Sequence, residues 1–454
     1  MPERTRPRLG PRPLPLHLAL ANLTWVSSRS ALPFWRSGLP GWRPEAAEPL
    51  SQLAAELAQV EQPAFDAAVD REVRSRLDRL FAGIDAYRRH PYQRAPDDLP
   101  VLWREGTTRL VDYRSAALAP DAPLLLVVPS LINRAYILDL LPERSLLRDL
   151  AARGFGPLLV DWDRPGEIER GFSLTDYIAG RLERALDAVL AASDRPVIVV
   201  GYCMGGNLAL ALAARRARDL AGLVCLATPW DFHADRASQA RLIGATTVSF
   251  EPLLQSLGEL PVDAIQALFA GVDPLQVVRK FVAFAGSEPD SPRARLFVAV
   301  EDWLNDGVPL AAAAARECLA DWYGSNTTGR GEWRIAGQPV EPASVDLPSL
   351  VVIPDHDRIV SPASALPLAA TLPRAQSLRP AAGHIGMVVG SSAEARLYAP
   401  LADWLQQHGA KAKRGGKRRA ASRRAANGSP LSRKGARDYA VSQTQKPPGK
   451  GVSR

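Results

Sequence analysis

The stretch that decides the fold runs from Arg195 to Arg216 and reads Arg-Pro-Val-Ile-Val-Val-Gly-Tyr-Cys-Met-Gly-Gly-Asn-Leu-Ala-Leu-Ala-Leu-Ala-Ala-Arg-Arg. Its first six residues are a β-branched apolar run with the length of a buried strand, and the part from Asn207 onward has the Ala and Leu content of a helix. Between them, small residues crowd a tight turn that can raise a nucleophile at its apex. The sequence therefore predicts a strand, a sharp turn and a helix, with the thiol of Cys203 as the nucleophile.

The composition is that of a globular protein with a sizeable core. The chain has 454 residues, of which 46% are hydrophobic, enough for one large domain with insertions or for two domains. It contains no apolar run of about 18 residues, and Met1 to Pro15 is broken by arginines and prolines. Three cysteines (Cys203, Cys225 and Cys318) are too few for a disulfide framework and lack metal-ligand spacing. We therefore expect a cytoplasmic protein without a transmembrane segment.

The basic character of the chain is concentrated at its C-terminal end. The formal net charge is +8, but residues 411–454 hold fourteen Lys or Arg and one acid, Asp438, so this tail carries +13 and the rest −5. The tail has almost no large apolar side chains and cannot offset the entropy of ordering, so we expect residues 410–454 to be disordered. It is either simply solvated or attached electrostatically, without sequence specificity, to a polyanion such as nucleic acid or polyphosphate.

Short apolar runs alternate with helical patterns over much of the chain. The strand-like runs are 101–104, 108–113, 124–128, 157–161, 197–200, 222–227 and 349–354. Helical patterns at 145–153 and 174–190 lie between several of them, and another, 393–407, closes the series. Fully apolar strands that alternate with helices predict an α/β protein with a mostly parallel sheet and helices on both faces.

The alternation is interrupted between Asp231 and about Arg330, where the sequence becomes mainly helical and includes aromatics such as Phe269 and Tyr323. We interpret this segment as an inserted cap. The predicted organisation is an irregular N-terminal extension (1–45), a helical segment with early strands (46–115), the first part of the core (116–231), the helical cap (232–330), the second part of the core (331–409) and a disordered basic tail (410–454).

A cysteine nucleophile needs a base, because an unperturbed thiol is only a few per cent ionised at pH 7. Of six histidines, only His384 lies in a short Gly-rich loop after a possible last strand. The chain order nucleophile, acid, histidine of an α/β-hydrolase requires an acid between Cys203 and His384, just past a strand. Asp355 and Asp357 both qualify, and Asp357 is favoured because the Arg-Ile-Val-Ser-Pro that follows resembles the usual extension beyond the acid. The predicted triad is Cys203, Asp357 and His384.

Segments outside the elbow carry a family resemblance. They are Val127 to Leu140, which ends in Tyr-Ile-Leu-Asp-Leu, Arg144 to Trp162, Leu174 to Ile178, Thr228 to His233, and Gly383 to Gly386. These segments resemble the polyhydroxyalkanoate synthases, members of the α/β-hydrolase superfamily. Dienelactone hydrolases share a Gly-Tyr-Cys-x-Gly-Gly elbow on a similar fold, so the elbow alone does not distinguish the two families. The resemblance extends from about His90 to about Gln407 and implies an α/β-hydrolase fold.

The resemblance also implies an activity. The substrate would be a 3-hydroxyacyl-coenzyme A, the product a growing polyester chain with release of coenzyme A, and no cofactor or metal would be needed. Cys203 would carry the acyl group, His384 would act as base and Asp357 would orient it. Backbone N–H groups at Met204 and near Ser130 or Leu131 would form the oxyanion hole. The enzyme would work in the cytoplasm, at the surface of a polyester granule, and whether it needs a homodimer or a second synthase subunit stays open.

One departure from the family pattern lies near the expected oxyanion hole. The family usually has two prolines and a tryptophan before Ile-Asn, whereas this chain has Pro129, Ser130 and Leu131. These replacements bear on substrate preference and rate. Two other functions remain open. A Cys-dependent hydrolase, such as a polyester depolymerase, a thioesterase or a dienelactone-hydrolase-like enzyme, would use the same triad with water as acceptor. A non-catalytic protein would instead use its tail to tether granules or bind nucleic acid.

Overall fold

The computed structural model describes residues 7–28, 30, 44–95 and 98–409. The basic tail predicted at 410–454 lies outside the described residues, as do positions 1–6, 29, 31–43 and 96–97. Within the described residues, no helix combines the length and the apolar character that crossing a membrane requires.

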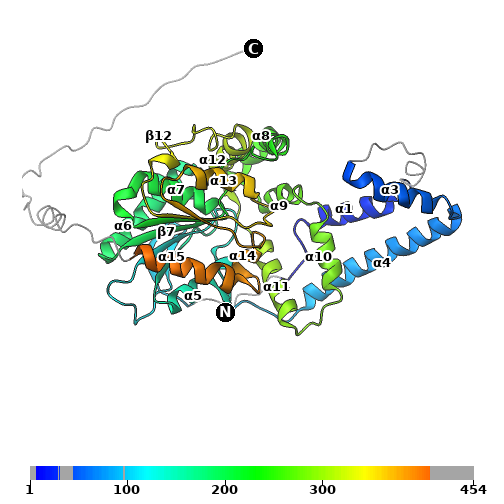
Figure 1. Ribbon diagram of the computed structural model, residues 1–454, viewed down its shortest axis with the longest axis horizontal. Coiled ribbons are helices and arrows are strands. Elements are labelled where there is room, and N and C mark those ends of the chain that lie inside the picture. The colour runs from blue at the N-terminus through cyan, green and yellow to red at the C-terminus, as the bar shows by residue number, and fades with distance from the viewer. Residues whose placement is uncertain (1–6, 29, 31–43, 96–97, 410–454) are drawn as a thin grey trace, which may run out of the picture. The chain divides into compact units, whose positions relative to one another are not determined.

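Within the described residues, an eight-stranded sheet forms the centre of the fold (Figure 1). In spatial order its strands are β1 (Val101–Glu105), β2 (Thr108–Asp112), β6 (Gly156–Asp161), β3 (Leu124–Val128), β7 (Val197–Tyr202), β8 (Gly222–Leu226), β13 (Ser349–Val352) and β14 (Ala375–Leu378). The pairs β1–β2 and β2–β6 are antiparallel, and the remaining pairs are parallel. The prediction of a mostly parallel sheet is confirmed.

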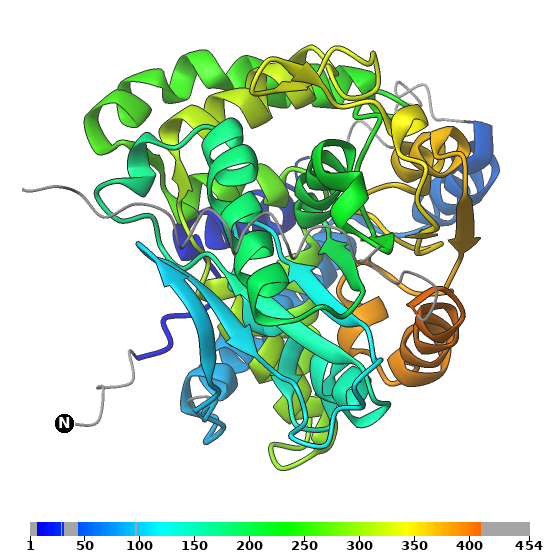
Figure 2. The ribbon, with the colours of Figure 1, turned by 90° about the vertical axis from the view of Figure 1, so that its left-hand side faces the viewer.

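Helices cover both faces of this sheet, as the apolar strands predicted. Successive residues of β3 point to opposite faces, so Leu126 joins one apolar cluster and Leu125 joins another. Leu208 of α7 packs in the first cluster, and Leu401 of α15 packs in the second. Figure 2 shows the green helices α6 and α7 on one side of the strands and the orange α15 on the other. The helical elements of the core are η1 (Ala135–Leu138), α5 (Leu146–Ala152), η2 (Glu169–Gly171), η3 (Asp176–Leu182), α6 (Glu183–Ala192), α7 (Met204–Arg216), η4 (Ala217–Asp219), η6 (Pro342–Ser344), α13 (Pro362–Thr371), α14 (Gly386–Val389), η7 (Glu394–Tyr398) and α15 (Ala399–Gly409).

The chain between β8 and β13 is mainly helical, which confirms the inserted helical segment. Its helices are α8 (Ala237–Leu257), α9 (Val262–Ala270), α10 (Gln276–Phe284), α11 (Pro292–Asn305), α12 (Ala312–Arg316) and the π-helix η5 (Glu317–Gly324). Short antiparallel pairs are β4 (Asp139–Leu141) with β5 (Arg144–Ser145), β9 (Glu259–Leu260) with β10 (Leu310–Ala311), and β11 (Arg334–Ile335) with β12 (Gln338–Pro339). Within the insertion, α8 packs along η5. The exact limits of a separate cap, 232–330, stay a prediction.

The N-terminal extension is not irregular throughout, and that prediction is wrong for helix α1 (Leu14–Val26). The prolines that suggested irregular structure lie at the start of the helix, where an N–H would have no partner in any case. The side chains of His17 and Ala21 are buried, and α1 contacts both α4 (Gln62–Arg89) and α10. Together with α3 (Pro44–Leu57), α4 lies where the apolar spacing predicts helices.

Candidate active site

Cys203 lies at the turn between β7 and α7 in a strained backbone conformation. Its φ of 56° and ψ of −130° are rarely adopted by residues other than glycine. The turn is held by a hydrogen bond of 2.8 Å from the N–H of Cys203 to the carbonyl of Leu226. The following glycines are required by close contacts: a Cβ at Gly205 would lie 2.1 Å from the Val128 carbonyl oxygen, and one at Gly206 would lie 1.8 Å from Thr228 Oγ1. The sequence forms the sharp nucleophile turn that it predicts.

His384 and Asp357 contact each other beside this turn. His384 Nδ1–H donates to Asp357 Oδ2 at 2.7 Å, and the side chains are 7% and 0% exposed. Asp357 Oδ1 accepts two backbone hydrogen bonds of 2.9 Å, from Ile359 and Val360. The carboxylate is therefore fixed on both sides. It holds the imidazole in the tautomer whose Nε2 can accept a proton.

The other candidate acid, Asp355, lies at the surface and forms an ion pair of 2.7 Å with Arg379. Its side chain is 34% exposed, and within the described residues no hydrogen bond joins it to His384. The two carboxylates separated by one residue thus have different surroundings. Only Asp357 is in a position to orient the histidine.

The charge state of His384 depends on its neighbours. Burial by itself lowers the pKa of this imidazole, but the negative charge of a Cys203 thiolate, the hydrogen bonds to Asp357 and Cys203, and the charge of Asp357 together raise it above its usual 6.5. His384 is hydrogen-bonded to Asp357, and it lines the smaller cavity together with Cys203. The surroundings of His384 thus favour its charged form, an imidazolium beside the Asp357 carboxylate.

The residues predicted for the oxyanion hole occupy different positions around Cys203. Met204 is the first residue of α7, so its N–H has no acceptor within the helix. Ser130 lines a cavity of about 50 Å³ together with Cys203 and His384. The side chain of Leu131 is buried in the apolar core, so this residue could contribute only its backbone. The carbonyl of Pro129 accepts a hydrogen bond of 3.1 Å from the Trp162 indole, which fixes the start of this loop.

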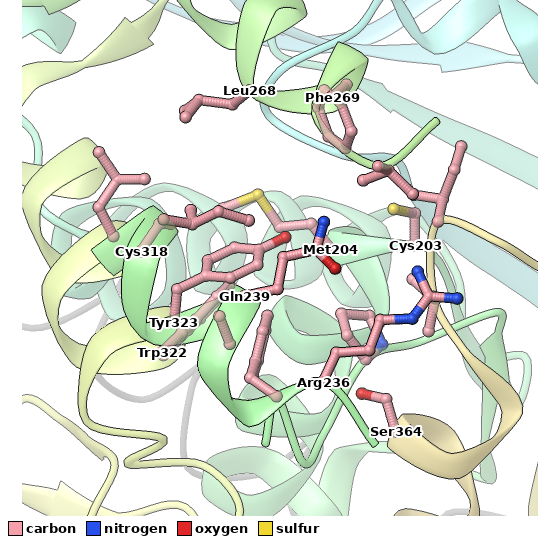
Figure 3. Close-up of a pocket in the computed structure, with 18 of the residues that line it drawn as sticks. Cys203, Met204, Arg236, Gln239, Leu268, Phe269, Cys318, Trp322, Tyr323 and Ser364 are labelled. Atoms are coloured by element: carbon pink, nitrogen blue, oxygen red, sulfur yellow. The ribbon is translucent and has the colours of Figure 1, made fainter. Parts of the chain in front are cut away.

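A larger apolar cavity of about 170 Å³ also has Cys203 in its lining (Figure 3). Most of its lining comes from the helical insertion, including Leu268 and Phe269 of α9 and Trp322 of η5. A few polar side chains also reach it, among them Arg236 and Ser364. Cys203 lines both this cavity and the smaller one, so the nucleophile lies where the two approach each other.

Two tyrosines near the site were not predicted to take part in it. Tyr202 precedes the nucleophile on β7, its hydroxyl donates to the His384 carbonyl at 3.2 Å, and its ring centroid lies 5.2 Å from that of the imidazole. Its position next to Cys203 in a buried strand was the available signal. Tyr323 lines the larger cavity with Cys203. In the sequence it was one of several aromatics in the insertion, with no signal of its own. Its place beside the cavity depends on how α8 packs on η5.

Of the remaining cysteines, Cys225 lies within a buried strand, whereas Cys318 lines the larger cavity together with Cys203. Burial raises the pKa of the Cys225 thiol to about 12, which keeps it protonated within strand β8. Burial also raises the pKa of Cys318 well above its usual range. Among the described residues, no three or more His, Cys, Asp or Glu side chains are grouped in a way that could hold a metal ion.

Comparisons with known proteins show the family and the fold to which the chain is similar. Residues 123–391 match the family model described as alpha/beta hydrolase fold. The poly(3-hydroxyalkanoate) polymerase subunit PhaC of Synechocystis is 30% identical over 318 residues, which cover 68% of this chain and 84% of that protein. The protein of the same name from Haloferax mediterranei is 28% identical over 312 residues, 68% of this chain and 63% of its own length. The match thus spans less than two thirds of the Haloferax relative. These relatives confirm the resemblance drawn from the motifs.

The solved structures similar to this chain are more distant. An alpha/beta hydrolase fold protein from Nakamurella multipartita covers 66% of this chain and 95% of its own, with 17% identity and a TM-score of 0.39. A thioesterase domain from the curacin biosynthetic pathway covers 68% of this chain and 100% of its own, with 16% identity and a TM-score of 0.41. At this level of likeness, neither says anything about the reaction.

Proposed function

Because the chain belongs to the poly(3-hydroxyalkanoate) polymerase family within the α/β-hydrolase fold, we propose that it is a cysteine acyltransferase that polymerises 3-hydroxyacyl groups. Its substrates would be 3-hydroxyacyl-coenzyme A thioesters, and its products a polyester and coenzyme A. The observation that carries the proposal is the position of Cys203. It lies on a strained turn, lines a small cavity together with His384, which is hydrogen-bonded to Asp357, and also lines a larger apolar cavity.

The first step would be acylation of Cys203. His384 accepts the thiol proton, and the thiolate attacks the carbonyl carbon of the substrate thioester. The bond between that carbon and the coenzyme A sulfur then breaks, and the departing thiolate takes the proton back from His384. The step exchanges one thioester for another, so it is nearly isoenergetic. The acyl group keeps enough energy to acylate an alcohol afterwards.

The second step would form the ester. His384 removes the proton from the 3-hydroxyl group of another hydroxyacyl unit, and that oxygen attacks the acyl group on Cys203. The carbon–sulfur bond to Cys203 breaks, an ester forms and the thiolate is regenerated. In both steps, N–H groups at Met204 and near Ser130 or Leu131 would bind the developing oxyanion. Losing one such donor costs about 3 kcal/mol in a serine protease.

The surroundings of Cys203 favour transfer to an alcohol over transfer to water. Asp357 and His384 are buried, and the cavity beside the thiol is lined mainly by apolar side chains from the insertion. A site that excludes water protects a reactive acyl intermediate from hydrolysis. Because two cavities approach each other at Cys203, the acyl group and the attacking hydroxyl could arrive from different sides.

The proposed product and the relatives also bear on where the enzyme works and on its partner chain. An insoluble polyester that grows from the site would hold the enzyme at a granule surface in the cytoplasm. The relatives from Synechocystis and Haloferax are named as polymerase subunits, which supports a partner chain for this protein, either a second copy or a different subunit. Attachment of the basic tail to a polyanion stays a prediction.

The test is incubation of the purified protein with 3-hydroxybutyryl-coenzyme A at several protein concentrations. We expect thiol release together with insoluble polymer, and loss of both in Cys203→Ala. A rate that rises more than proportionally with protein concentration would indicate self-association. Thiol release accompanied only by soluble hydroxyacid would instead identify a cysteine hydrolase. Unchanged thiol release in Cys203→Ala would remove this cysteine from the mechanism.

A further inference from the structure

Among the hydroxyl groups that line the larger cavity, that of Tyr323 has a role that the proposed acyl transfer leaves open. Tyr323 lines this cavity together with Cys203. In Figure 3 its hydroxyl points toward the middle of the cavity, on the side of Met204. Within the described residues, this hydroxyl makes no hydrogen bond to a side chain or to the backbone, although phenols in apolar surroundings usually have a partner.

The position of the Tyr323 ring is well defined. The ring packs edge-on against Phe232, with centroids 4.8 Å apart and planes at 64°. The backbone carbonyl of Tyr323 accepts a hydrogen bond of 2.8 Å from His233 Nε2. Both partners lie just after β8, at the start of the insertion, so they tie its end, η5, to its beginning. The ring contact and the backbone hydrogen bond together define where the hydroxyl lies.

Two of the other polar side chains in the lining already have partners. Asp235 accepts a hydrogen bond of 2.8 Å from Ser361, and Gln239 donates one of 3.2 Å to the Gly271 carbonyl. Most of the remaining lining is aliphatic or aromatic. A polar atom of a bound acyl group would therefore find the Tyr323 hydroxyl as a ready donor.

The size of the cavity agrees with a short acyl group. At about 170 Å³ it is close to the engineered cavity of about 150 Å³ that binds benzene, a molecule of six carbons. The 3-hydroxyl of a substrate lies two carbons beyond the thioester carbonyl, so it stays close to Cys203 during acylation. Tyr323 lines the same cavity as Cys203, and burial raises the pKa of its phenol, which therefore stays protonated and can donate a hydrogen bond.

We propose that the Tyr323 hydroxyl hydrogen-bonds the 3-hydroxyl oxygen of the acyl group being loaded onto Cys203, and so selects 3-hydroxyacyl over unsubstituted acyl thioesters. This assignment rests on the proposed acyl transfer, and it names the side chain that recognises the substrate's 3-hydroxyl group. The physical basis is that a hydroxyl in an apolar cavity is left unpaired when the ligand lacks its partner. Sites of this kind react much more slowly with an analogue that lacks the hydrogen-bonding group.

The test compares acylation of the whole protein by 3-hydroxybutyryl-coenzyme A and by butyryl-coenzyme A, which lacks the 3-hydroxyl. Rapid quenching followed by intact-protein mass spectrometry gives kcat/KM for acylation with each thioester. We expect the wild type to favour the hydroxyacyl substrate by about tenfold or more, and Tyr323→Phe to lose about tenfold of that preference. Because the hydroxyl has no protein partner, the variant removes only this group and should fold normally.

Two control variants separate recognition from general damage. Ser364→Ala removes another hydroxyl from the lining of the same cavity, and Tyr87→Phe removes a phenolic hydroxyl that donates to Asp302 outside both cavities. Both should keep the wild-type ratio between the two substrates. The assignment would be overturned if Tyr323→Phe slowed both thioesters equally, or if Ser364→Ala abolished the preference. A wild type that is acylated by neither thioester would refute the proposed function and the assignment with it.

Discussion

Replacing Asp357 with asparagine tests how the histidine is oriented. Oδ1 of Asp357 accepts two backbone N–H bonds of 2.9 Å, and Oδ2 accepts Nδ1–H of His384 at 2.7 Å. An asparagine can satisfy the two N–H donors only with its oxygen, so its NH₂ group must face the imidazole. The histidine then has to accept at Nδ1 and carry its proton on Nε2, where it can no longer take the proton of Cys203.

The size of the effect follows from this wrong tautomer. The same replacement in a Ser-His-Asp triad lowers kcat by about 10⁴. A thiol ionises more readily than a hydroxyl, so we expect a loss of about 10³ in the acylation rate of Asp357→Asn, or about 4 kcal/mol of transition-state stabilisation. The assay is rapid-quench measurement of acyl-Cys203 formed from 3-hydroxybutyryl-coenzyme A at neutral pH.

Asp355→Asn is the matched control, because Asp355 pairs with Arg379 at the surface. It should change the rate by less than about threefold, as expected for an exposed ion pair of small energetic effect. The reasoning would be refuted by an Asp357→Asn protein that retains a third or more of the wild-type rate. It would equally be refuted if Asp355→Asn were the variant that lost activity.

The remaining predictions concern the turn, the histidine and the thiols. Gly205→Ala should lower the free energy of unfolding by about 3 kcal/mol, because its Cβ would meet the backbone of Val128. Gly171→Ala is the control: its Cβ would enter open space, so the free energy of unfolding should change by less than about 0.5 kcal/mol. Chemical denaturation measures both values. Folding raises the pKa of His384, so its stabilising contribution is fully present below its usual 6.5 and declines as the pH rises above that value. The stability difference between wild type and His384→Gln should therefore shrink toward alkaline pH, and a difference that grows would contradict the assigned charge pair. Iodoacetamide at pH 8 should label Cys203 before Cys225, because burial raises the pKa of the Cys225 thiol to about 12. Peptide mass spectrometry measures the order of labelling, and the opposite order would contradict the assignment of Cys203 as the reactive thiol.

The sequence predicted the buried part of the sheet well, because strands covered on both faces contain only apolar residues. β3 and β8 are buried along their whole length and were found within one residue of their limits. The last strand, β14, could be located only vaguely. It lies at the edge of the sheet, reads Ala-Gln-Ser-Leu and is partly exposed, so its pattern is too polar and too short to set bounds.

The N-terminal helix α1 was missed for a related reason. Its prolines and the arginines around it resemble an irregular segment, and its helical character depends on contacts with α4 and α10. Those partners lie far away in the sequence. Local composition therefore gave the wrong answer where tertiary packing decides the structure.

The chain order of Cys203, Asp357 and His384 was readable because each follows a strand or lies in a Gly-rich loop. The choice between Asp355 and Asp357 depended on a turn in which only one carboxylate receives the N–H groups of residues 359 and 360. Tyr323 could not be predicted as a site residue, because its approach to Cys203 is set by how the helical insertion packs. The three residues of the proposed triad could therefore be chosen from the sequence, whereas the cavity beside Cys203 required the structure.

The central claim is that Cys203 becomes acylated and then passes its acyl group to a hydroxyl. The most direct measurement is peptide mapping of the protein quenched within one turnover of 3-hydroxybutyryl-coenzyme A. We predict a 3-hydroxybutyryl group, or a short oligomer of it, on the peptide that contains Cys203, with no such adduct in Cys203→Ala. An unmodified Cys203 peptide during active release of coenzyme A, or an acyl group on a different residue, would contradict the account.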